Sequence, residues 1–76
     1  MPPKNSTTRI LLGSTIRAVR KERGYTQESF AAKAEIDRSY YGAIERGEFN
    51  LTVNKVLQIT DGLGLTAADL FERAGL

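Results

Sequence analysis

The sequence contains no cysteine, no histidine and no tryptophan, and its only two prolines lie within the first three residues. Without cysteine the chain can form neither a disulfide bond nor a thiolate metal site, and the absence of histidine argues further against a small zinc-stabilised fold. No apolar run approaches the ~18 residues that a membrane-spanning helix needs, and no signal-peptide pattern is present. We therefore expect a soluble, cytoplasmic protein that needs no metal and no cofactor.

The same absences weigh against catalysis. Histidine and cysteine are among the commonest general bases and nucleophiles, and neither is available here. The sequence has no glycine-rich phosphate loop and no Ser-x-x-Lys motif, and its carboxylates, serines, lysines and tyrosines form no recognisable constellation. We expect neither an enzyme nor a small-molecule binding protein.

What is present suits one small α-helical domain. The 76 residues are 41% hydrophobic, enough for a single core. A core of this size stabilises a domain only marginally. Because no disulfide bond or structural metal is expected, oligomerisation is the remaining source of stability. The charges are uneven, since residues 1–46 carry 9 Lys/Arg against 5 Asp/Glu and residues 47–76 carry 2 against 4. A basic half of this kind is typical of a nucleic-acid surface, although ordinary scatter of surface charge is the alternative.

Apolar spacing and cap residues predict five helices. Leu12, Ile16 and Val19 form one stripe of a helix over residues 9–23, which ends before Gly24. Four later N-cap residues, each flanked by an apolar pair at hydrophobic-staple spacing, place helices at 27–34, 38–46, 53–62 and 67–73: the caps are Thr26, Asp37, Thr52 and Thr66. No segment alternates with period two, so we expect an all-α fold. Residues 1–8 are predicted to be a flexible arm ahead of one domain at 9–76, the alternative being an arm that contacts DNA.

The helices at 27–34 and 38–46 are separated by only three residues, which is the layout of a helix-turn-helix. Small residues at Ala31 and Ala34 would let the second helix approach closely, with Ile36, Tyr41 and Ile44 facing the core. The opposite face of the second helix would then present two arginines separated by small residues, a shape that fits a DNA groove: Arg38, Ser39, Gly42, Ala43 and Arg46.

Five segments of the chain resemble the Cro/repressor-type (xenobiotic-response-element, XRE) helix-turn-helix family, in register and without gaps. They are Leu12-Gly13-x-x-Ile16-Arg17-x-x-Arg20-Lys21-Glu22-x-Gly24, Thr26-Gln27-Glu28, Ile44-Glu45-Arg46-Gly47, Asn50-Leu51-Thr52 with the apolar residues up to Leu65, and Asp69-Leu70-Phe71. The resemblance implies a compact, lambda-repressor-like five-helix bundle that binds double-stranded DNA. The run Ile36-Asp37-Arg38-Ser39-Tyr40, with the motifs that follow it, is similar to the controller proteins of restriction–modification systems. Those are short dimeric regulators, which implies a pseudo-palindromic operator, autoregulation of an operon and RNA polymerase as a further partner.

The role expected of each DNA-contacting residue follows from its position on or near the predicted helix at 38–46 and from the resemblance. Arg38, at its first turn, is expected to read guanine edges, although a phosphate contact is the alternative. Ser39 is expected to be a second reader, and Ala43 to meet a thymine methyl group. The predicted backbone contacts are Gln27, Tyr40, Arg46 and Arg17, with a solvated surface position as the alternative for Arg17 and a partly buried core position for Tyr40.

Two further pairs are structural. The resemblance implies an ion pair between Arg20 and Glu45 that ties the predicted helix at 9–23 to the end of the predicted helix at 38–46. Phe71 and Leu76 are expected in a homodimer interface, because Leu65 and Leu70 already fill the core-facing staple positions; the alternative is that Phe71 and Leu76 also cap the core. The alternative function is an antitoxin or adaptor that uses the same fold to hold a protein partner.

Overall fold

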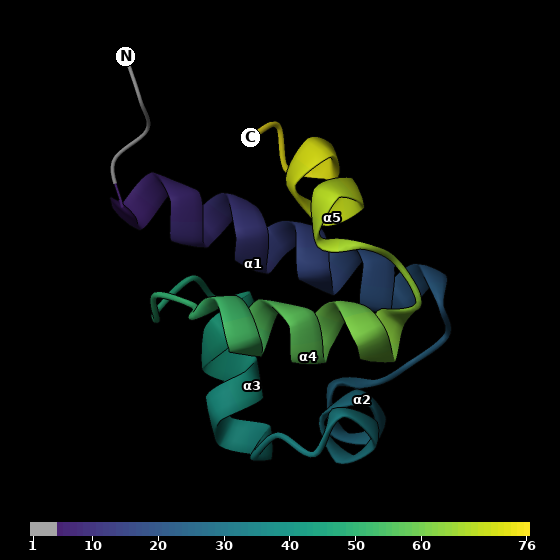
Figure 1. Ribbon diagram of the computed structural model, residues 1–76. Coiled ribbons are helices and arrows are strands. Elements are labelled where there is room, and N and C mark those ends of the chain that lie inside the picture. The colour runs from purple at the N-terminus through teal and green to yellow at the C-terminus, as the bar shows by residue number, and fades with distance from the viewer. Residues whose placement is uncertain (1–4) are drawn as a thin grey trace.

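The computed structural model describes residues 5–76, and within that range the chain forms five helices and no strand: α1 (Asn5–Glu22), α2 (Gln27–Ala34), α3 (Arg38–Glu45), α4 (Val53–Leu63) and α5 (Ala67–Arg73). The all-α prediction is confirmed. Helix α1 lies across the middle of the molecule, with α5 on one side and the α2–α3 pair on the other (Figure 1). Helix α4 packs against α2 and α5 and closes the bundle.

The predicted N-caps are all present. In each case the cap side chain accepts a hydrogen bond from the backbone N–H three residues later: Thr26 from Ser29, Asp37 from Tyr40, Thr52 from Lys55 and Thr66 from Asp69. These four helices consequently begin at the predicted residues and end within one residue of the predicted ends. Caps are local interactions, so the sequence alone could locate them.

The beginning of α1 differs from the prediction. The arm was expected to extend to residue 8, but α1 already begins at Asn5, and only residues 1–4 lie outside the described residues. Arg9 contributes to this difference, because its Nε donates to the Gly47 carbonyl at 3.2 Å and its Nη1 donates to Asn50 Oδ1 at 3.2 Å. Contacts so distant in sequence stabilise a helical start that the polar residues 5–8 do not predict by themselves.

The core is centred on two aromatic side chains of the α2–α3 pair. Phe30 and Tyr41 are fully buried, with ring centroids 5.2 Å apart. Tyr25, the staple partner of Phe30, packs edge-on against it at 5.6 Å. Ile44 of α3 is also fully buried, and the other helices contribute Ile16, Val19, Ile59 and Leu70. This shared core holds α3 at a defined angle to α2.

The turn between α2 and α3 is held by backbone geometry and by α4. Glu35 adopts the left-handed conformation, with φ 59°, which ends α2 and reverses the chain. Gln58 of α4 then donates through Nε2 to the Ala34 carbonyl at 2.7 Å, satisfying one of the exposed acceptors at the end of α2. The turn is therefore fixed relative to the core, and α3 projects from a rigid support.

Gly13 sets how closely α1 approaches α3. A Cβ atom at this position would lie 2.5 Å from the Ile44 carbonyl oxygen and 2.6 Å from that of Glu45. Both are backbone atoms, so the helices would have to separate. Gly13→Ala should therefore lower the free energy of unfolding by about 1–3 kcal/mol through overpacking, although alanine would favour an isolated helix by up to about 1 kcal/mol.

Urea denaturation followed by circular dichroism measures this difference. Ser14→Ala is the matched control, since Ser14 is the next residue on α1 and is exposed; its effect should stay within about 0.5 kcal/mol. A stabilising effect of Gly13→Ala would contradict the close approach.

Candidate nucleic-acid interface

The outer face of α3 and the beginning of α2 form a polar hollow on the surface, called here the α3 hollow. It is lined by Gln27, Arg38, Ser39, Gly42 and Arg46. Arg38, Ser39 and Arg46 are exposed, so their donor groups face solvent. The structure thus brings together four of the residues predicted to contact DNA, with glycine between the two arginines.

Gly42 keeps the α3 hollow open. A Cβ atom there would lie 3.3 Å from Arg46 Nη1 and 3.6 Å from Gln27 Oε1. The position therefore lies between the two side chains that flank the hollow, and any larger residue would fill it. A small residue here matches the predicted role of a surface that approaches DNA closely.

The prediction for Ala43 is wrong. Ala43 is only 5% exposed and does not line the α3 hollow, so its methyl group cannot meet a thymine. The chain turns directly after α3, with the Glu48 N–H donating to the Ala43 carbonyl at 3.0 Å. Helical geometry assigns Ala43 to the outer face, but in the folded chain this side chain is buried.

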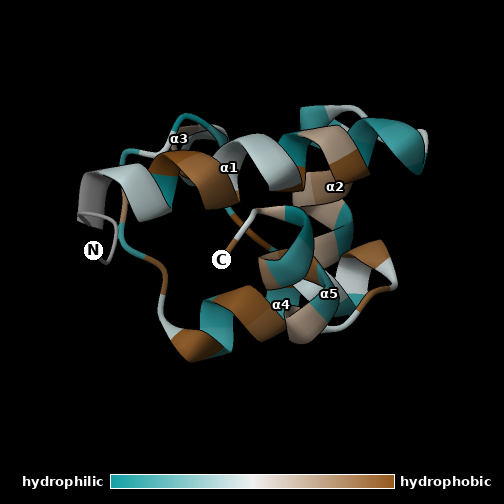
Figure 2. Cartoon of the chain, turned by 90° about the horizontal axis from the view of Figure 1, so that it is seen from above, coloured by the Kyte–Doolittle hydropathy of each residue, from teal (hydrophilic) through white to brown (hydrophobic). Residues whose placement is uncertain are grey.

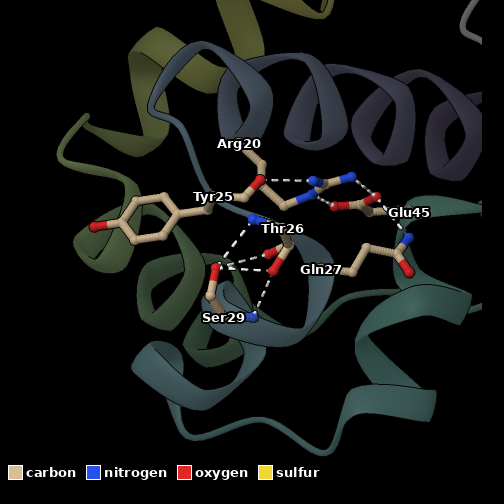
Figure 3. A network of polar contacts seen from close by, with 6 residues as sticks. All are labelled: Arg20, Tyr25, Thr26, Gln27, Ser29 and Glu45. Carbon is tan, nitrogen blue, oxygen red and sulfur yellow. Dashed lines mark hydrogen bonds and ion pairs between the residues drawn. The ribbon is translucent and has the colours of Figure 1, made fainter.

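Gln27 is positioned by its neighbours. It is the first residue of α2, where the helix dipole favours a negative group. Its Nε2 donates to Glu45 Oε1 at 2.9 Å (Figure 3). One amide hydrogen therefore binds the protein, and the second remains as a donor at the edge of the α3 hollow.

The ion pair implied by the resemblance is present. Arg20 Nε lies 2.7 Å from Glu45 Oε2 and Nη2 lies 3.1 Å from Oε1, while Nη1 donates to the Tyr25 carbonyl at 2.8 Å (Figure 3). The two side chains are only 7% and 2% exposed. Burial by itself would raise the pKa of Glu45, but the hydrogen bonds from Arg20 and Gln27 outweigh it and lower that pKa. The pair joins α1, α3 and the beginning of α2, so it supports the α3 hollow from behind.

Two predicted backbone contacts lie outside the α3 hollow. Tyr40 is half-buried, and its ring packs edge-on against Phe49 at 5.1 Å with Lys55 Nζ 5.7 Å from the ring centroid. This packing agrees with the core alternative for the ring and leaves the DNA contact of Tyr40 a prediction. Arg17 is exposed on α1, and its contact with DNA also stays a prediction.

A second surface feature is apolar. A groove between α1, α4 and α5, called here the apolar groove, is lined by Thr8, Leu12, Leu51, Val53, Val56, Leu57, Ala67 and Phe71. Val53 is 75% exposed, Leu57 44% and Phe71 37%, and Figure 2 shows strongly hydrophobic residues along α4, including its first turn. Leu76 is exposed but does not line this groove.

The sequence reading had missed Val53 and Leu57 as candidates for an interface. A signal was available, because α4 carries apolar residues at 53, 56, 57, 59 and 63, more than one buried stripe of a short helix can hold.

The part of the chain that the structure describes contains no helix long and apolar enough to span a membrane. Within the same residues, no cluster of three or more aspartate or glutamate side chains could hold a metal ion.

Known proteins with similar sequences and structures indicate the family to which this chain belongs. A family model described as "Helix-turn-helix" matches residues 16–75. Control protein C.MunI of a Mycoplasma species is 41% identical over 64 residues, covering 83% of this chain and 86% of that protein. Restriction–modification controller protein C.AhdI of Aeromonas hydrophila has a TM-score of 0.80 at 31% identity, covering 84% of this chain and 97% of that one. Controller protein C.Esp1396I, solved as a tetramer with its natural 35 base-pair operator, has a TM-score of 0.78 at 35% identity, with 86% of each chain covered.

Proposed function

Because this chain belongs to the XRE helix-turn-helix family, we propose that it is a sequence-specific regulator that binds a pseudo-palindromic operator as a homodimer. Its lambda-repressor-like fold and its relationship to controller proteins make it a DNA-binding protein and not an enzyme. We further infer that it regulates its own operon, within a restriction–modification system.

The observation that carries the proposal is the composition of the α3 hollow. Two arginines, a serine and a glutamine surround a glycine on the exposed face of α3. Arginine and glutamine donate to base edges and phosphates, and the missing side chain at Gly42 allows close approach. Recognition helices present such a face to the major groove.

Support for the homodimer comes from the apolar groove. Phe71 on α5 and Val53 and Leu57 on α4 expose hydrophobic surface along the apolar groove, and none of them lines the α3 hollow. A second copy bound there would leave both recognition helices free. Two half-sites spaced by about one helical turn, ~34 Å, would then be read together.

Selection of bound sequences from random duplex DNA, followed by gel shifts at two salt concentrations, tests the proposal. We expect an inverted-repeat site and an affinity that falls steeply with salt, because neutralised phosphates release counterions. A protein that folds but selects no sequence would contradict the regulator and favour an antitoxin or adaptor.

Arg38 is expected to carry most of the base discrimination. It is exposed at the first turn of α3 and lines the α3 hollow. Arg38→Ala should reduce discrimination at one base pair of each half-site by about 1–3 kcal/mol, the value of a bidentate arginine–guanine pair. Competition gel shifts with operators substituted at single positions measure this effect. An equal loss on every sequence would instead assign Arg38 to a phosphate.

A further inference from the structure

The loop after α3 places a carboxylate on one of the arginines of the α3 hollow. Arg46 Nε donates to Glu48 Oε2 at 2.6 Å, and Nη2 donates to Glu48 Oε1 at 3.4 Å. The contact has the fork-like geometry with which arginine also binds a phosphate group. The Arg46 and Glu48 side chains remain 59% and 53% exposed, so an incoming polyanion can reach the same guanidinium.

The backbone under this pair is fixed. The Gly47 N–H donates to the Ile44 carbonyl at 3.0 Å, the Glu48 N–H donates to the Ala43 carbonyl at 3.0 Å, and Gly47 has φ +76°, which together form a Schellman end to α3. Arg9 holds the Gly47 carbonyl from α1. Separating Glu48 from Arg46 therefore needs only rotation of exposed side chains, with no movement of the loop.

We propose that Glu48 occupies on Arg46 the place that a DNA phosphate takes in the complex, and that it thereby lowers the affinity of the protein for all DNA. The inference rests on the proposed function, because it requires Arg46 to contact the DNA backbone. The hydrogen bond from Arg46 also lowers the pKa of Glu48, so the carboxylate stays ionised at neutral pH. Binding of DNA must separate this pair and leave the Glu48 carboxylate beside a polyanion.

Glu48→Gln should therefore tighten binding of both the selected operator and unrelated duplex DNA by about threefold to tenfold, as expected when an exposed ion pair and one repulsive charge are removed. The dependence of log K on log salt should become steeper by up to about one unit, the contribution of one further neutralised phosphate. Fluorescence anisotropy titrations at several salt concentrations measure both quantities.

A double-mutant cycle with Arg46→Ala separates this mechanism from simple charge repulsion. Arg46→Ala alone should weaken binding of all sequences and flatten the salt dependence by about one unit. In the Arg46→Ala background, Glu48→Gln should keep only the smaller effect of removing one repulsive charge, because there is no longer an Arg46 side chain for Glu48 to occupy. Glu72→Gln removes an equal charge from exposed α5 and should leave the affinity unchanged.

Several outcomes would overturn the inference. The inference fails if the Glu48→Gln variant binds DNA with unchanged affinity. Weaker DNA binding by this variant would show that Glu48 orients Arg46 instead of blocking it. A full effect of Glu48→Gln without Arg46 would reduce Glu48 to a repulsive charge, and a silent Arg46→Ala would remove Arg46 from the contact. In each case the wild-type protein still binds its selected operator, whereas failure of the proposed function appears as wild-type protein that selects no site.

Discussion

Replacement of Glu45 by glutamine should lower the free energy of unfolding by about 3–5 kcal/mol, the usual cost of leaving one partner of a buried ion pair uncompensated. The guanidinium of Arg20 would keep the Tyr25 carbonyl but lose its carboxylate inside the protein. A domain of this length has a total stability of about 4–11 kcal/mol at typical values per residue. The variant should therefore lose a large part of its stability and melt at a clearly lower temperature. Urea denaturation monitored by circular dichroism, at fixed protein concentration, gives the difference.

The exposed pair between Arg73 and Glu22 provides the matched control. Arg73 Nη1 lies 3.1 Å from Glu22 Oε2, but the two side chains are 44% and 55% exposed. Glu22→Gln should therefore change the free energy of unfolding by less than about 1 kcal/mol. The double variant Arg20→Met with Glu45→Met should recover much of the loss, because no buried charge remains. Equal effects of Glu45→Gln and Glu22→Gln would show that the first pair is not desolvated in solution.

The pH dependence gives an independent check on the Glu45 prediction. The folded protein lowers the pKa of Glu45 below its unfolded value. The corresponding stability is therefore fully present above the unfolded pKa of about 4.3 and disappears as the pH falls through the folded pKa. Stability measured between pH 7 and pH 3 should fall more for the wild type than for Glu45→Gln.

Introduction of a charge at Phe71 should convert the proposed homodimer to a monomer and weaken operator binding by about 10²–10⁴-fold, the range lost when two linked binding modules are separated. Phe71 is 37% exposed and lines the apolar groove, where glutamate would be buried without a partner in the dimer. Sedimentation at micromolar concentration should give about twice the 8.4 kDa chain mass for the wild type and a single chain mass for Phe71→Glu.

Two further variants separate loss of the dimer from other effects. Phe71→Lys should also be monomeric, and because lysine does not repel DNA, its weak operator binding would reflect the lost partner. Val53→Glu tests the groove at a residue that is 75% exposed and contributes little to the monomer core, so it should dissociate the dimer without lowering monomer stability. A wild-type protein that remains monomeric both in solution and on DNA would exclude this interface.

Much of the fold could be predicted from the sequence because its signals are local. A threonine or aspartate cap bonds to an N–H three residues away, and a staple pair spans five residues, so Thr26 and Asp37 locate α2 and α3 without knowledge of the tertiary structure. The amphipathic spacing similarly identified the exposed Arg38, Ser39 and Arg46. The local pattern also predicted that Tyr41 and Ile44 face the core, and both are buried.

Other features depended on contacts between segments distant in sequence. The early start of α1 follows from bonds between Arg9 and the loop after α3. The burial of Ala43, which is only 5% exposed, likewise did not follow from helical spacing. Hydrogen bonds from Gln27 and Arg20 to Glu45 join α1, α2 and α3. The resemblance to a family implied the Arg20–Glu45 pair, but nothing in the sequence indicated the bond from Gln27.

The sequence by itself therefore determined that the chain is helical, where four of its helices begin, and which face of α3 is polar, because each depends on neighbours within about one helical turn. Tertiary structure alone decided which residues of that face remain accessible and how closely Gly13 lets α1 approach α3. These depend on how the chain folds back on itself, and a local pattern carries no information about the distance between two segments that the core brings together.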